Sequence, residues 1–114
     1  MPSPTNKYFA LFGHEKIYIF HSDSKNLTRE IDYKAKYLLF DLQDEHILVT
    51  DSYELKQYSI INNASKMILS DEKKRNSISS LVYSPNHRDI FISNHSKIIS
   101  MDTFTLKINL NLIK

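Results

Sequence analysis

The sequence of 114 residues contains no cysteine. This absence excludes a disulfide scaffold, thiolate zinc sites and cysteine-based catalysis. The chain also contains a single glycine, Gly13. A glycine-rich phosphate-binding loop cannot be built from one glycine, so nucleotide hydrolysis of the P-loop kind is excluded. Turns that need a positive φ have to use Asn or Asp, the residues that tolerate this conformation best after glycine.

Long apolar runs and a strong net charge are missing as well. No stretch approaches the roughly 20 apolar residues of a membrane-spanning helix, and the first residues, MPSPTNKYFALFGHEKIYIF, lack the pattern of a secretory signal. A formal net charge of +2 is too small to favour a polyanionic partner by itself. We therefore predict an intracellular protein, cytoplasmic or nuclear, without membrane association.

The residues that are present fall into three similar units. Leu38–Ile60 aligns with Leu81–Thr103 without a gap at an offset of 43 residues, so that apolar residues meet apolar residues and turn residues meet turn residues. Tyr8–Phe20 aligns in the same way with His46–Tyr58 at an offset of 38 residues. Such periods indicate a repeat architecture. We predict one domain over residues 1–114, with units at approximately residues 7–33, 34–76 and 77–110.

Each unit consists of short runs rich in β-branched and aromatic residues, separated by Asn, Asp, Ser and His, which predicts strands and turns. No long window keeps the apolar stripe of a helix. The expected fold class is all-β. The predicted strands are Lys7–Phe12, Lys16–His21 and Leu27–Ile31, then Lys36–Leu42, His46–Thr50, Leu55–Ile60 and Lys66–Ser70, and finally Leu81–Ser84, Asp89–Ser93, Lys97–Asp102 and Leu106–Leu110.

Four strands in about 40 residues is the spacing of a propeller blade. The last unit resembles a WD40 repeat: "LVYSPN" stands at the first strand and turn, "DIFISN" at the second strand, and "KIISMDTFTLK" at the third and fourth. Within it, "MDTFT" stands at the place of the family's W-D-x-x-T, with Asp102 and Thr105 kept and Met101 in place of the tryptophan. The resemblance implies a partial β-propeller of about three four-stranded antiparallel blades. A β-sandwich or barrel is the alternative.

The number of blades bears on function, because propellers close with four to eight blades and this sequence has about three. The end blades of an open arc have faces that no neighbour covers, and such faces carry aliphatic and aromatic residues. A second copy, another protein, or some other cap has to cover them. We therefore predict a protein partner or self-association. The resemblance to WD40 proteins implies a non-catalytic scaffold or subunit of a multiprotein assembly.

Residues with catalytic or metal-binding chemistry form no recognised motif. None of the five histidines has the spacing of a metal site, and no nucleophile elbow is present. His21 with Asp23, or His46 with Asp44 or Glu45, are the acid–base pairs to consider, although acids beside histidines are common in turns. We predict no enzymatic activity, no metal and no cofactor.

Residues in turns are the candidate partner contacts. Tyr53 is expected in an exposed turn, and His87 with Arg88 in another. A basic cluster of Lys73, Lys74 and Arg75 links the second unit to the third; it indicates either a solvated loop or, as the alternative function, RNA contacts of a non-catalytic subunit. The same stretch, "KRNSI", resembles a basophilic kinase site at Ser77, where a phosphate would add about −2 charge.

Overall fold

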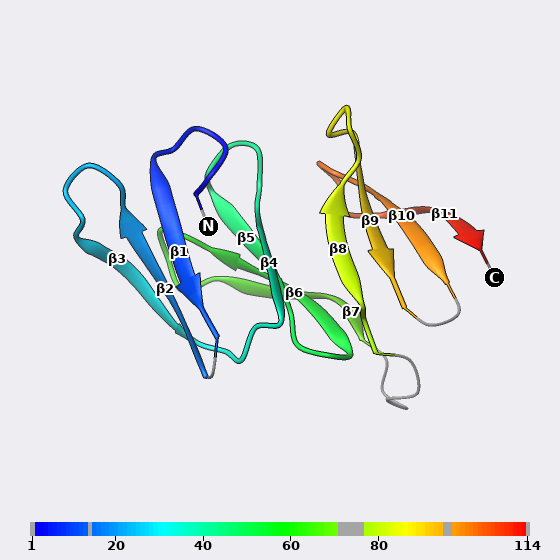
Figure 1. Ribbon diagram of the computed structural model, residues 1–114, viewed down its shortest axis with the longest axis horizontal. Helices are drawn as coiled ribbons and strands as arrows, with labels where there is room; N and C mark the ends of the chain where they lie inside the picture. Colours follow the sequence, from blue (N-terminus) through cyan, green and yellow to red (C-terminus); the bar gives the residue numbers. More distant parts are fainter. Residues whose placement is uncertain (1, 14, 71–76, 95–96, 114) are drawn as a thin grey trace.

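Three antiparallel sheets make up the part of the protein that the structure describes. The computed structural model describes residues 2–13, 15–70, 77–94 and 97–113, and for residues 109–113 it describes the backbone alone. In each sheet the strands follow one another in chain order (Figure 1). Sheet A contains β1 (Tyr8–Phe12), β2 (Lys16–His21) and β3 (Leu27–Asp32); sheet B contains β4 (Tyr37–Phe40), β5 (His46–Thr50), β6 (Glu54–Ser59) and β7 (Ser65–Ser70); sheet C contains β8 (Ser80–Tyr83), β9 (Asp89–Ser93), β10 (Ile98–Asp102) and β11 (Ile108–Ile113).

The predicted all-β fold is confirmed, and the strands lie where the repeat places them. The bounds of β2, β5 and β9 coincide with the predicted ones, and most other ends differ by one or two residues. β4 is shorter than the predicted Lys36–Leu42 because Asp41 already begins the next turn, where its side chain accepts a hydrogen bond from the backbone N–H of Glu45 at 2.8 Å.

The sheets stand side by side along the longest dimension of the molecule, which measures 45 Å, with sheet B between the other two (Figure 1). Sheet B is therefore covered on both faces. Alternate residues of β5 point to opposite faces of a sheet, and Ile47, Leu48 and Val49 are all at most 2% exposed. Among the described residues, sheets A and C are each covered on one face, so these residues form an arc of three blades with two ends.

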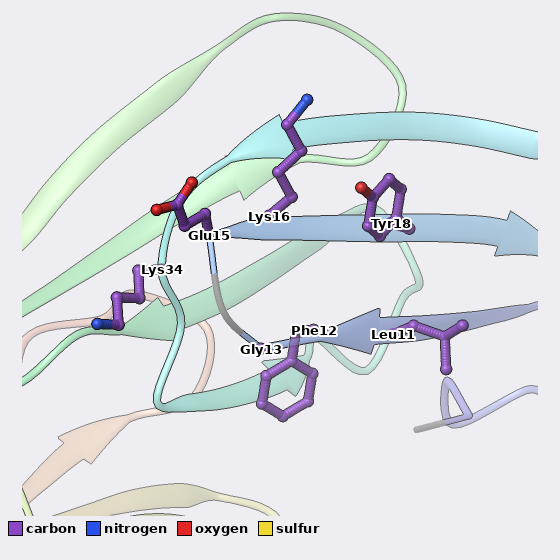
Figure 2. A pocket seen from close by; sticks show the side chains of 7 residues that line it. All are labelled: Leu11, Phe12, Gly13, Glu15, Lys16, Tyr18 and Lys34. Carbon is purple, nitrogen blue, oxygen red and sulfur yellow. The ribbon is translucent and has the colours of Figure 1, made fainter.

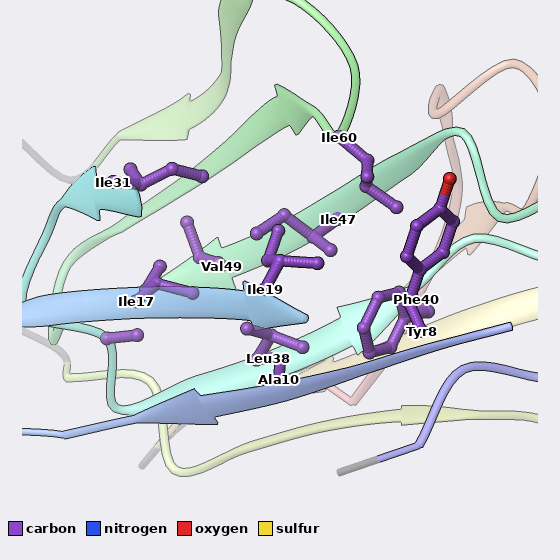
Figure 3. Packing of buried hydrophobic residues seen from close by; sticks show 11 residues of the cluster. Tyr8, Ala10, Ile17, Ile19, Ile31, Leu38, Phe40, Ile47, Val49 and Ile60 are labelled. Atoms are coloured by element: carbon purple, nitrogen blue, oxygen red, sulfur yellow. The ribbon is translucent and has the colours of Figure 1, made fainter. Parts of the chain in front are cut away.

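Two separate apolar cores fill the spaces between the sheets. In the first, Ile17 and Ile19 of sheet A pack against Ile47 and Val49 of sheet B (Figure 3). In the second, the other face of sheet B packs against sheet C, and Met101 is completely buried there. The second core consists of Leu39, Leu48, Leu55, Ile78, Leu81, Ile90, Ile92 and Met101. Met101 is thus a core residue.

Hydrogen bonds from side chains to backbone carbonyls also tie sheet B to sheet C. The hydroxyl of Tyr37 donates to the carbonyl of Ser79 at 2.6 Å, and the ammonium group of Lys36 donates to the carbonyl of Ile78 at 3.0 Å. In the opposite direction, from sheet C to sheet B, the hydroxyl of Tyr83 donates to the carbonyl of Phe40 at 2.6 Å. These bonds join the short strands β4 and β8, which are neighbours in space.

The turns use residues other than those expected. The scarcity of glycine predicted Asn or Asp wherever φ is positive, and Asn6 and Asp44 follow this rule. Lys25, His87 and Leu106 do not, although their φ values lie between 59° and 60°. Each of these three residues stands at a fixed position of a repeated turn, so the hydrogen bonds of the turn impose a conformation that the side chain itself does not favour.

Candidate interaction surfaces

The outward face of sheet A carries a group of aromatic and aliphatic side chains, which we call the A-face: Phe9, Leu11, Tyr18, Phe20 and Leu27. The strand register places Phe9 opposite Phe20 and Leu11 opposite Tyr18. The rings of Phe9 and Phe20 are stacked, with their centroids 5.1 Å apart. Leu11 is 55% exposed and Leu27 is 50% exposed. An apolar group of this size on a surface is typical of an interaction site.

A shallow hollow of about 630 Å³ adjoins the A-face at the hairpin between β1 and β2 (Figure 2). Lys16 lies at its edge and forms an ion pair with Glu30 at 2.7 Å, and the hydrogen bond and charge of Glu30 raise the pKa of Lys16. The hollow is lined by Leu11, Phe12, Gly13, Glu15, Lys16, Tyr18 and Lys34. It combines apolar walls with charged edges.

The outward face of sheet C is the second uncovered surface, the C-face, defined by Val82, Phe91 and Ile98 with Ser80 and Ser93. Val82 pairs with Phe91, and Ser93 pairs with both Ser80 and Ile98, so the five side chains share one face. Val82 is 48% exposed. The hydroxyl groups of Ser80 and Ser93 are 2.6 Å apart and satisfy each other. The C-face is therefore apolar at its centre, with the serines beside it and Asp89 and Asp102 at the strand ends on the same face.

Three turns at the same end of the sheets have one geometry. They are Ser3–Tyr8, Asp41–His46 and Ser84–Asp89. In each, the first residue donates its N–H to the carbonyl of the sixth, at 2.8, 2.9 and 2.8 Å respectively. The fourth residue in each has a positive φ: 62° in Asn6, 56° in Asp44 and 60° in His87. The repeat therefore extends to the segment before β1, and Pro2 forms a bridge with Phe9 as Phe40 pairs with Ile47.

A buried carboxylate joins the first two of these turns. Asp44 is 6% exposed, and its Oδ2 accepts hydrogen bonds from the hydroxyl groups of Ser3, at 3.2 Å, and Thr5. Its other oxygen, Oδ1, is buried without a hydrogen-bond partner. These hydrogen bonds of Asp44 therefore hold the segment before β1 on sheet B. From the sequence, Asp44 is a candidate partner of His46, but in the structure His46 Nδ1 lies 3.1 Å from Asp41 Oδ2.

The predicted contact residues lie in turns, but the structure does not bring them together. Tyr53 lies in the turn between β5 and β6, where it is half-buried instead of exposed and its N–H donates to Asp51 Oδ1 at 2.8 Å. His87 and Arg88 are exposed in the turn between β8 and β9, at the opposite end of the strands. Ser77 is half-buried just before β8. Lys73, Lys74 and Arg75 lie outside the described residues.

The aspartate of the motif "MDTFT" caps a turn, and a serine caps the equivalent turn of sheet B. Asp102 Oδ1 accepts the N–H groups of Phe104 at 2.9 Å and Thr105 at 2.8 Å, and these bonds lower the pKa of Asp102. At the equivalent position of sheet B, the hydroxyl of Ser59 accepts two N–H groups of its turn, each at 3.2 Å. Ser59 therefore stands in the middle unit where Asp102 stands in the last one, and it caps its turn in the same way.

Tyr83 gives the contact between sheets B and C a dependence on pH. Burial, followed by the charge of Asp41, raises the pKa of Tyr83 to about 12. In the unfolded chain a tyrosine loses its proton near pH 10. Between about pH 10 and pH 12 the unfolded state therefore binds fewer protons than the folded state, and the free energy of unfolding falls as the pH rises. We expect a loss of about 1 to 2 kcal/mol across this window, allowing for partial solvent screening.

Urea unfolding at pH 9 to 12, followed by circular dichroism, measures this loss. The Tyr83→Phe variant is the control: it is less stable at neutral pH because the hydrogen bond to Phe40 is missing, but its stability declines less steeply above pH 10. Tyr33, whose pKa burial also raises, contributes the remaining slope. Parallel profiles for the two proteins contradict the assignment to Tyr83.

Two further observations concern membranes and metals. Across the residues that the structure describes, no helix has the length and apolar character needed to cross a bilayer. Within the same residues, no three His, Asp or Glu side chains are grouped as ligands for a metal ion.

Comparisons with known proteins identify the fold. No family model and no curated protein matches the sequence. Three solved structures are similar to this chain, and each similarity covers 99% of it. The N-terminal domain of Nup159 has a TM-score of 0.75 and 15% sequence identity, and the Cps50 (Swd1) β-propeller domain of Myceliophteria thermophila has a TM-score of 0.71 and 8% identity. The hydrazine synthase of Kuenenia stuttgartiensis has a TM-score of 0.70 and 10% identity. The three sheets are thus blades of a partial β-propeller. The chain spans 32 to 41% of the length of these proteins.

Proposed function

We propose that the chain is a non-catalytic, WD40-like scaffold module that binds protein partners in a multiprotein assembly inside the cell. The observation that carries the proposal is the apolar character of both ends of the arc. Leu11 on the A-face and Val82 on the C-face are each about half exposed, although their equivalents in the buried sheet B, Val49 and Leu39, are at most 8% exposed. The lack of cysteine agrees with a reducing compartment.

Repeated turns provide a second kind of contact. His87 and Arg88 project from one of the three similar turns, and exposed turns on a rigid scaffold are where recognition residues concentrate. The RNA alternative rests on Lys73, Lys74 and Arg75, which lie outside the described residues. The apolar A-face and C-face are the observations that favour a protein partner.

Affinity capture from an extract of the cells that express the chain tests the proposal. The bait is the full chain, compared with Leu11→Asp on the A-face, Val82→Lys on the C-face, and Ile61→Asp as the matched control. Ile61 is 75% exposed in the turn between β6 and β7, away from both faces. We expect proteins that the original chain and the control retain and at least one face variant loses. A retained set that is the same for all four baits contradicts the proposal.

A further inference from the structure

The internal repeat relates the A-face to surfaces that are buried elsewhere in the same chain. At the offset of 38 residues, Phe9, Leu11 and Phe20 correspond to Ile47, Val49 and Tyr58 of sheet B. Ile47 and Val49 are completely buried against sheet A, and Tyr58 packs on the same core. At the offset of 43 residues, the corresponding residues of sheet C are Ile90, Ile92 and Met101, which are 0%, 3% and 0% exposed. In both other blades, therefore, a preceding blade covers this face.

The C-face has the complementary relationship. Its apolar residues Val82, Phe91 and Ile98 correspond, at the offset of 43 residues, to Leu39, Leu48 and Leu55 of sheet B. Those three leucines are 8%, 2% and 0% exposed because sheet C covers them. The face that sheet B turns toward its following blade is thus present again on sheet C, with apolar residues at the same three positions.

The two uncovered faces are consequently the two sides of one type of interface. Within the chain, Leu39, Leu48 and Leu55 share a core with Ile90, Ile92 and Met101. Their equivalents on the uncovered faces are Val82, Phe91 and Ile98 on one side, and Phe9, Leu11 and Phe20 on the other. These six uncovered side chains are all apolar. The register also places Lys16 and Glu30 on the outward face of sheet A, and Asp89 and Asp102 at the strand ends on the outward face of sheet C.

We propose that two copies of the chain associate head to tail, with the A-face of each copy packed on the C-face of the other. This inference rests on the proposed function and names the partner as a second copy. Two copies contribute six blades, which lies within the four to eight with which propellers close. The ring contains the same contact twice, and a head-to-tail contact that closes gives a finite assembly.

A contact between two A-faces is the competing arrangement within a dimer. It would place Phe9 and Phe20 of one copy against the same residues of the other, a pairing for which the chain contains no internal counterpart. It would also bury one interface and leave the C-face of each copy uncovered. The head-to-tail ring buries two interfaces, which together supply the total of about 1,200–2,000 Å² that is typical of a specific association. It leaves neither apolar face uncovered.

Sedimentation velocity over a range of concentrations tests the proposal with the purified full chain, Leu11→Asp, Val82→Lys and the control Ile61→Asp. The replaced side chains are 55%, 48% and 75% exposed, so each variant is expected to fold, and a thermal melt checks this. We expect the original chain and the control to be dimers. Each face variant is expected to dissociate at least tenfold more readily, because each substitution damages both contacts of its own ring.

A mixture of the two face variants distinguishes the arrangements. Leu11→Asp keeps an intact C-face and Val82→Lys keeps an intact A-face, so the mixture restores one complete contact, and the other combines opposite charges. We expect a dimer of the two variants that neither forms alone. Loss of association with Leu11→Asp but not with Val82→Lys identifies the contact between two A-faces and overturns the head-to-tail ring.

A monomer at all concentrations overturns the second copy as partner. The proposed function then depends on the capture experiment: retention of another protein that the face variants lose keeps the scaffold role with a different partner. A monomer that also retains no protein in this manner contradicts both proposals.

Discussion

Replacing Ile47 by alanine is expected to lower the free energy of unfolding by about 2 to 5 kcal/mol. The side chain is completely buried between sheets A and B, where it packs in the core that Figure 3 shows. Removing it leaves a cavity that neighbouring residues on two sheets cannot easily fill. Because a domain is stable by only about 5–15 kcal/mol, this one substitution consumes a large share of the total. Urea unfolding followed by circular dichroism measures the change.

The matched control lies at an equivalent place on an uncovered face. Leu11 corresponds to Val49, the neighbour of Ile47 on the same face of β5, but it is 55% exposed. Leu11→Ala should therefore change the stability of the monomer by no more than about 0.5 kcal/mol. The comparison is made at a concentration low enough to keep the chain monomeric. A loss as large as that of Ile47→Ala would mean that the monomer itself covers the A-face.

Replacing Asp44 by alanine is expected to cost about 2 to 4 kcal/mol. Two hydroxyl groups lose the side-chain oxygen that accepts their hydrogen bonds, and the hydroxyl of the buried Ser3 is left without this partner. In addition, alanine is strained at the φ of 56° that this position has. Thermal unfolding measures the stability, and hydrogen exchange at the amides of Ser3 and Asn6, which donate within the first turn, shows whether that segment leaves sheet B.

Two variants separate the causes. Asp44→Gly also loses the hydrogen bonds but accepts a positive φ without strain, so it should be more stable than Asp44→Ala by about 1 kcal/mol. Asp44→Asn keeps one acceptor oxygen and tolerates the conformation, so its loss should be the smallest of the three. Equal stability of the Ala and Asn variants would contradict the role given to the carboxylate.

The strands could be predicted from the sequence because each unit repeats the same alternation between apolar runs and turn residues. β2, β5 and β9 were predicted to the residue, since charged or polar turn residues bound each of them closely. The presence of two apolar end faces followed from the number of blades. Which side chains lie on those faces required the pairing register, because a shift of one residue moves every side chain of a strand to the other face.

Features that depend on hydrogen bonds between distant segments could not be predicted in this way. The turn Ser3–Tyr8 was missed, although Ser3-Pro4 repeats the Ser84-Pro85 of the third blade and was a usable signal. The burial of Asp44 depends on that turn, so nothing in its own neighbourhood indicated it. The capping role of Ser59 could not be predicted either, because an alignment compares residue identities and does not show that a hydroxyl caps a turn as a carboxylate does.

The connection of each strand to its sequence neighbour has a consequence for the speed of folding. Within the described residues, every strand pairs only with strands adjacent to it in the chain, so the ladders form from consecutive hairpins that close short loops. All-β proteins whose pairing joins distant segments fold slowly because long loops must close first. This arc avoids that delay. We expect it to fold faster than a β-sandwich of the same length. Sheet B is expected to provide the surface on which sheets A and C then pack.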